Sequence, residues 1–88
     1  PLSFKLEQNY PNPFNPSTTF RYSIPQLSKV VIKVYDILGN EIATLLDEEK
    51  SVGTYELTWN AANLPSGVYF YHIKAGEYVN TKKMILLK

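Results

Sequence analysis

The chain has no cysteine among its 88 residues. It can therefore form no disulfide framework and no Cys-based zinc site, and it has no thiolate nucleophile. We expect packing alone to stabilise it, in an extracellular setting as well. It also lacks an apolar run near the roughly 20 residues of a bilayer-spanning helix, so we predict no membrane insertion. Residues 1–3 lack the charged start and apolar run of a signal peptide, so we expect any such signal in a longer parent protein upstream of Pro1.

The sequence has no excess of charge of one sign. Nine basic and eight acidic residues give a net charge of +1, which argues against nucleic acid as a partner, because phosphate binding needs a basic face. Residues 47–49 (Asp-Glu-Glu) predict a solvated loop, or alternatively half of a calcium site if further oxygen ligands lie nearby. Lys82 and Lys83 are typical of an edge strand whose charge discourages pairing, or alternatively of an electrostatic handle for a receptor.

Residues for catalysis are missing too. His72 is the single histidine; strand alternation turns it outward, and nothing places an acid or a nucleophile beside it. The four glycines are scattered, so we expect no phosphate-binding loop. We expect the acidic residues in turns or on outward faces rather than paired in a cleft. The sequence therefore predicts no enzyme, no cofactor and no metal site.

What the sequence has almost throughout is a hydrophobic period of two. We predict seven strands, at residues 4–8, 18–24, 29–35, 41–46, 53–59, 67–74 and 78–87. Strands every 8–12 residues or so, with turn signals between them, are typical of an all-β sandwich. We therefore predict one domain over residues 1–88 with an immunoglobulin-like, seven-stranded antiparallel β-sandwich. The 41–46 strand breaks the alternation, which indicates a bulge or a sheet edge.

Turn residues separate these strands. Residues 36–40 predict a turn in which Asp36 caps backbone donors and Gly39 or Asn40 has a positive φ. Residues 75–77 predict a tight hairpin around Gly76. Residues 60–66 predict a crossover between strands that is not a hairpin.

The segment after this crossover has the spacing of a tyrosine corner, in which a Tyr hydroxyl near the start of a late strand binds backbone upstream. We predict that Gly67 and Tyr69 belong to such a corner. Tyr71 would then occupy the core position that a Cys fills in antibody domains. Trp59, at the end of the fifth strand, is predicted to face inward as well.

Residues 10–17 form a proline-rich stretch, Tyr-Pro-Asn-Pro-Phe-Asn-Pro-Ser. The prolines fix φ and favour an extended backbone at the residue before each of them. We interpret the segment as a rigid strap between the two sheets, with Phe14 as a plug in the core. A preformed recognition strip is the second interpretation, and the two are compatible.

Aromatic residues make up 14% of the chain, which raises one alternative for its surface. Outward Tyr35 and Phe70, either alone or together with Tyr78, would form a flat sugar-stacking platform of the kind that carbohydrate-binding modules use. We favour cross-strand aromatic pairing, which stabilises a sheet by up to about 1 kcal/mol per pair.

Four segments carry a resemblance to a known family. They are residues 9–18 (NYPNPFNPST), 34–39 (VYDILG), 64–69 (LPSGVY) and 83–88 (KMILLK). In this order they closely resemble the type A sorting domains at the carboxyl ends of proteins that the type IX secretion system of Bacteroidetes exports. The resemblance extends over residues 6–88. The strand pattern is also similar to the immunoglobulin-like domain of flagellar hook-capping proteins.

The resemblance implies a non-catalytic secretion and cell-surface sorting module that sits last in a larger secreted protein. It implies folding in the periplasm and recognition by the outer-membrane translocon. In many members a sortase-like peptidase then removes the domain and joins the parent to surface lipopolysaccharide. The alternatives are an accessory carbohydrate-binding module of a secreted glycoside hydrolase and a flagellar assembly domain. On the resemblance we expect the recognition surface to comprise Asn12, Pro13, Phe14, Asn15, Pro16, Lys82, Lys83, Met84, Ile85, Leu86, Leu87 and Lys88.

Overall fold

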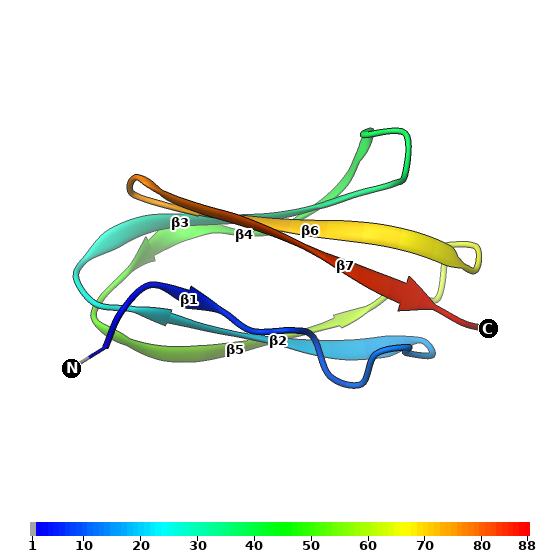
Figure 1. Cartoon of the computed structure of the whole chain (residues 1–88), viewed down its shortest axis with the longest axis horizontal. Coiled ribbons are helices and arrows are strands. Elements are labelled where there is room, and N and C mark those ends of the chain that lie inside the picture. Colours follow the sequence, from blue (N-terminus) through cyan, green and yellow to red (C-terminus); the bar gives the residue numbers. More distant parts are fainter. Residues whose placement is uncertain (1) are drawn as a thin grey trace.

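The computed structural model describes residues 2–88; Pro1 lies outside the described residues. Seven strands and no helix make up this part of the chain (Figure 1). The strands are β1 (Lys5–Leu6), β2 (Ser17–Ile24), β3 (Ser28–Tyr35), β4 (Glu41–Lys50), β5 (Gly53–Asn60), β6 (Gly67–Ala75) and β7 (Tyr78–Leu86).

The strands form two sheets that face each other, one of order β1-β2-β5 and one of order β4-β3-β6-β7 (Figure 1). All strand pairs within the sheets are antiparallel. The chain changes sheet between β2 and β3, between β4 and β5, and between β5 and β6. The prediction of an all-β, seven-stranded, immunoglobulin-like sandwich is confirmed, and so is the crossover at residues 60–66.

The core lies between the sheets because alternate residues of each strand point inward. On β3, Val30, Ile32 and Val34 are all fully buried, while the residues between them are more exposed. The buried apolar residues are Leu6, Phe14, Phe20, Tyr22, Ile24, Val30, Ile32, Val34, Ala61, Tyr69, Tyr71, Ile73, Ala75, Met84 and Leu86. Burying a side chain of this size contributes about 1.5–3 kcal/mol, so these residues dominate the stability of the fold.

Two strands differ from the prediction by more than one residue at an end. β1 is reduced to Lys5–Leu6, and β4 continues through residues 47–49 to Lys50. The prediction of a loop at 47–49 was wrong, because these residues pair with β3 at the edge of the sheet, where acidic side chains remain solvated. The register shifts between β3 and β4 confirm the predicted irregularity of this edge strand.

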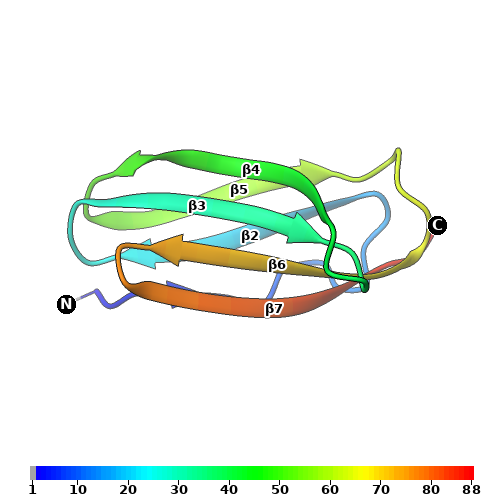
Figure 2. The same cartoon turned by 90° about the horizontal axis from the view of Figure 1, so that it is seen from above.

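The loops are divided between the two ends of the sandwich. The amino-terminal segment, the β2–β3 loop, the β4–β5 turn and the β6–β7 hairpin lie at one end (Figures 1 and 2). The proline-rich segment 10–17, the β3–β4 turn, the β5–β6 crossover and the carboxyl terminus lie at the other (Figures 1 and 2). The segments that carry the family resemblance therefore meet at one end, although they are far apart in the sequence.

Candidate functional site

The proline-rich strap, residues 10–17, binds the last strand of the sandwich. The Phe14 N–H donates to the Ile85 carbonyl over 2.9 Å, and the Leu87 N–H donates to the Phe14 carbonyl over 3.0 Å. These two bonds form a parallel bridge between Phe14 and Leu86. The Asn12 side-chain oxygen accepts a third bond from the Ile85 N–H, over 3.0 Å. The strap thus occupies the free edge of β7 as a short extra strand would.

The other end of the strap is attached to the opposite sheet. Tyr10 and Thr19 of β2 exchange two backbone hydrogen bonds, of 3.0 and 2.9 Å. The Phe14 side chain is only 2% exposed and lies 6.2 Å from Trp59, between ring centroids. The predicted strap between sheets, its Phe14 plug and the inward position of Trp59 are therefore confirmed.

A buried amide that sequence reasoning missed supports the start of the strap. Asn9 is 2% exposed, and its side-chain NH₂ donates to the Thr18 hydroxyl over 3.0 Å and to the Pro11 carbonyl over 3.2 Å. The Thr18 hydroxyl in turn donates to the same carbonyl over 2.9 Å. The sequence does carry a signal for these contacts, namely an Asn directly before a Tyr-Pro pair. Asn side chains readily form hydrogen bonds with nearby backbone in turns.

The last residues of the chain also contact the β5–β6 crossover. The Lys88 N–H donates to the Ser66 hydroxyl over 2.9 Å, and the Lys88 ammonium group donates to the Ala62 carbonyl. We call the strap (10–17), the tail (85–88) and the crossover (61–66) together the tail clamp. All its parts lie at the end of the sandwich away from the amino-terminal segment (Figure 1).

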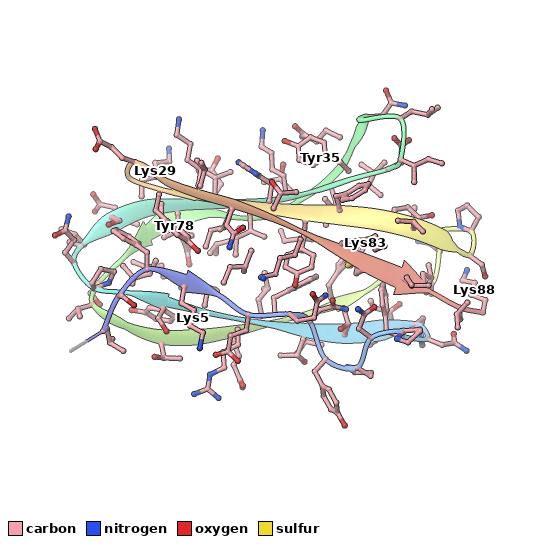
Figure 3. The ribbon with its side chains drawn as sticks, viewed as in Figure 1. Lys5, Lys29, Tyr35, Tyr78, Lys83 and Lys88 are labelled. Carbon is pink, nitrogen blue, oxygen red and sulfur yellow. The ribbon has the colours of Figure 1, made fainter. Side chains whose placement is uncertain are left out.

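The expected recognition residues divide into three groups by burial. Phe14, Met84 and Leu86 are buried and shape the surface from below. Pro16, Lys82 and Ile85 are half-buried. Asn12, Pro13, Asn15, Lys83, Leu87 and Lys88 are exposed and available to a partner; Figure 3 labels the two lysines of this group.

The tyrosine corner next to the tail clamp is confirmed. The Tyr69 hydroxyl donates to the Pro65 carbonyl over 2.7 Å, and the Tyr69 side chain is buried. Gly67 begins β6 just after this loop. The corner therefore fixes the crossover that provides the Ser66 and Ala62 partners of the tail.

Tyr71 occupies the centre of the core, as predicted, and its ring lies 4.6 Å from Phe20 of β2, between centroids. Its hydroxyl donates to the Glu7 carbonyl over 2.9 Å and accepts from the Asn9 N–H over 2.8 Å. Burial raises the pKa of the Tyr71 hydroxyl to about 12, although the hydrogen bond from Asn9 acts in the opposite direction. Sequence reasoning placed the ring but missed these two bonds.

The β3–β4 turn is closed by hydrogen bonds and exposes two apolar side chains. The Asp36 carboxylate accepts from the Asn40 and Leu38 N–H groups, both over 2.9 Å, and Gly39 has a φ of +85°. The predicted cap is therefore confirmed. The Asn40 N–H is the main reason that the pKa of Asp36 is lowered, with further bonds from the Asn40 side chain and Leu38. Ile37 and Leu38 at the tip are 67% and 82% exposed.

The aromatic residues do not form the three-residue platform. Tyr35 and Phe70 are cross-strand neighbours on the outer face of the four-stranded sheet. Tyr78 instead pairs with buried Ala75, faces the interior and stacks on Phe4 with 5.3 Å between ring centroids. Its place in the platform was wrong, because the alternation of β7 that buries Met84 also turns Tyr78 inward.

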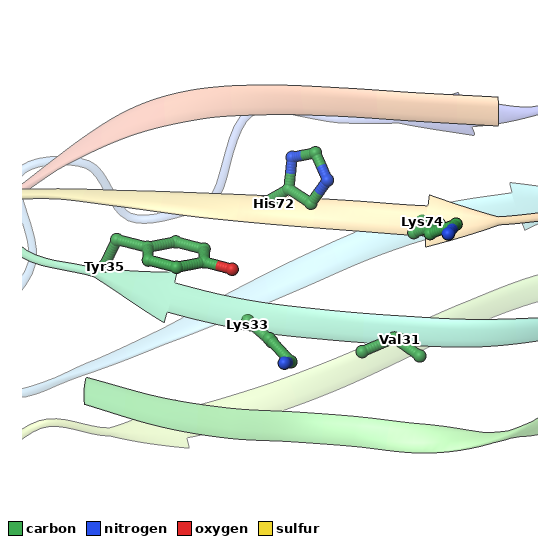
Figure 4. Close-up of a pocket in the computed structure, with 5 residues that line it drawn as sticks. All are labelled: Val31, Lys33, Tyr35, His72 and Lys74. Atoms are coloured by element: carbon green, nitrogen blue, oxygen red, sulfur yellow. The ribbon is translucent and has the colours of Figure 1, made fainter. Parts of the chain in front are cut away.

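The single histidine lies near a threonine hydroxyl. His72 lies on the outer face, and its Nδ1 is 2.7 Å from the Thr81 hydroxyl oxygen (Figure 4). In the described part of the chain, no three His, Cys, Asp or Glu side chains come together as a metal site would require. Residues 2–88 also contain no helix with the length and apolar character to cross a membrane.

Comparison with known proteins identifies a family and a fold. Residues 8–87 match the model of the family described as secretion system C-terminal sorting domain. The chain also resembles a solved chain from a study of PorZ, an essential bacterial surface component of the type-IX secretion system of Porphyromonas gingivalis. The two are 21% identical with a TM-score of 0.60, and the match covers 97% of this chain and 11% of that chain. This chain therefore spans about a tenth of the length of that one. No curated protein matches the sequence.

Proposed function

Because the chain belongs to the family of secretion system C-terminal sorting domains, we propose that its tail clamp is the surface by which type IX secretion machinery recognises it. The domain is a sorting signal for type IX secretion, and cargo of such signals is secreted or reaches the cell surface. Family membership does not support catalysis by the domain itself, since the family consists of sorting signals.

The observation that carries the proposal is the meeting of strap, crossover and tail. Three backbone and side-chain bonds tie residues 12–14 to residues 85–87, and two more tie Lys88 to the crossover. The tail therefore has a defined shape with exposed Leu87 and Lys88 at its end. A preordered surface loses little conformational entropy on binding, which favours affinity for a receptor.

The buried and the exposed residues of this region have different roles. Phe14, Met84 and Leu86 act through the fold, because their side chains are not accessible to a partner. Asn12, Asn15 and the two terminal residues Leu87 and Lys88 make the contacts, together with Lys83 on the adjoining face. We further propose that the domain folds in the periplasm, that the outer-membrane translocon is its first partner, and that a sortase-like peptidase acts afterwards.

The other two readings have less support. A sugar platform would be limited to Tyr35 and Phe70, because Tyr78 is turned toward the interior, and the family match gives no support to carbohydrate binding. A flagellar assembly role has no specific observation in its favour.

The test is a fusion of residues 1–88 to the carboxyl end of a periplasmic reporter that carries its own signal peptide. The reporter should appear in the medium or on the surface of a host with a working type IX system. It should remain in the periplasm of the matched strain without the translocon. Retention of the reporter in both strains contradicts the proposal.

A further inference from the structure

The two outer faces of the sandwich differ in composition. On the three-stranded sheet, the outer face carries Thr19, Arg21, Ser23, Thr54, Glu56 and Thr58 as cross-strand neighbours. Hydroxyl groups face each other there, with 3.2 Å between Thr19 and Thr58 and 3.3 Å between Ser23 and Thr54. Such a polar surface is normal for an antiparallel sheet with one face in water.

The outer face of β3, β6 and β7, on the four-stranded sheet, is less polar. It carries a group of half-buried apolar side chains that we call the apolar face: Val31, Tyr35, Val68, Phe70 and Ile85. The group is contiguous near the tail clamp, since Tyr35 pairs with Phe70 and Val68 pairs with Ile85. The β3–β4 turn projects from this sheet near the tail clamp (Figure 1), and it carries the exposed side chains of Ile37 and Leu38. A contiguous apolar patch with a polar rim marks an interaction site.

The rim of the apolar face is polarised in charge. Two of the three outward acids of β4 form ion pairs, since Asp47 lies 3.4 Å from Lys29 and Glu41 lies 3.0 Å from Lys33. On the β6 and β7 side, Lys74 and Lys83 form no ion pair with any acid of residues 2–88. Figure 4 shows Lys33 and Lys74 beside Val31, Tyr35 and His72 on this face.

We propose that the apolar face docks on a folded protein of the secretion machinery whose surface has an apolar centre and acidic side chains opposite Lys74 and Lys83. The proposal rests on the proposed function and adds a second contact region to the tail clamp. The regions are continuous, because Lys83 and Ile85 belong both to this face and to the strand that the strap holds.

The mixture of charges on this face favours a protein over a lipid surface. The β4 rim presents Glu41, Asp47 and Glu49 on the same side of the sheet as Lys29, Lys33, Lys74 and Lys83. With three acids against four lysines, the face has little net charge to attract an anionic membrane, whereas a protein surface can complement acids and lysines at once. The proposed partner is therefore a protein.

Two variants in the reporter fusion test the proposal. Tyr35→Thr with Phe70→Thr removes the aromatic centre and keeps side chains that suit strands. Lys74→Glu reverses an exposed lysine of the rim that lies outside the tail clamp. Lys5→Glu is the matched control, with the same change in charge at an exposed lysine on the outer face of the other sheet that forms no ion pair with the acids of residues 2–88.

Export of both face variants should fall at least about tenfold, as is common when an aromatic or charged anchor is lost from an interface. The Lys5→Glu control should be exported like the unchanged chain, and Lys74→Arg, which keeps the charge, should be exported normally as well. Urea unfolding of each purified domain shows whether a variant has lost its fold. If one of the two face variants unfolds, the export of the other tests the proposal.

Normal export of folded face variants overturns the inference and leaves the proposed function intact. Retention of the unchanged chain, by contrast, refutes the proposed function and this inference with it. Flotation with phosphatidylglycerol vesicles tests the alternative that the apolar face binds a lipid surface. Binding of the unchanged domain that the lysine reversal abolishes would identify a lipid surface and contradict a protein partner.

Discussion

The hydroxyl group of Tyr71 accepts a hydrogen bond from the backbone N–H of Asn9 over 2.8 Å. Tyr71 belongs to β6 of the four-stranded sheet, and Asn9 lies between β1 and the strap, on the side of the other sheet. The same hydroxyl donates to the Glu7 carbonyl over 2.9 Å. One side chain therefore joins the two layers in a protein that has no cysteine with which to do so.

The first prediction concerns the loss of this hydroxyl. Tyr71→Phe keeps the ring against Phe20 but leaves the buried Asn9 N–H and Glu7 carbonyl without this partner. The free energy of unfolding should fall by about 1–3 kcal/mol. Urea unfolding measures it, with Tyr35→Phe as a control on the outer face. Equal losses in both variants would contradict a special role for Tyr71.

The second prediction concerns alkaline pH. The pKa of Tyr71 is raised to about 12 in the folded chain, whereas an unfolded tyrosine titrates near 10. The stability that neutral Tyr71 contributes is therefore complete below pH 10 and is lost as the pH rises toward 12. The stability difference between the unchanged chain and Tyr71→Phe should shrink over this interval. A difference that stays constant from pH 9 to about 12 would contradict it.

The sequence predicted most of the fold because its strands, with the exception of β4, follow a period of two. The positions of Val30, Ile32 and Val34 in the core followed from alternation alone. The corner followed from the spacing of Gly67 and Tyr69, and the strap followed from the prolines of residues 10–17. In each case, short-range chemistry and the global fold favour the same conformation.

The features that the sequence did not predict depend on contacts between residues that are distant in the chain. Residues 47–49 look like a loop by composition, and only their pairing with β3 makes them a strand. Asn9 and Tyr71 are distant in the sequence, so no local pattern announces their bond. For the candidate site, the resemblance indicated the residues. Which of them are buried, and which hydrogen bonds join the strap to the tail, became known only from the structure.

The third prediction concerns the plug of the strap. Phe14→Ala leaves a cavity beside Trp59 and should lower the free energy of unfolding by about 3–5 kcal/mol. Asn15→Ala, at the neighbouring exposed position, should change it by less than about 0.5 kcal/mol. Thermal unfolding of the two variants compares them directly. A small effect of Phe14→Ala would mean that the strap is not part of the core.

The central claim is that the ordered tail is the recognised surface, and one truncation tests it most directly. Removing Leu87 and Lys88 deletes the bonds to Phe14, Ser66 and Ala62 but keeps Leu86 in the core. The measurement is the exported fraction of the reporter fused to residues 1–86, beside the full fusion and a Glu77→Ala control at the opposite end. We predict that the truncated fusion stays in the periplasm while the domain still unfolds cooperatively. Export equal to that of the full fusion would contradict the claim.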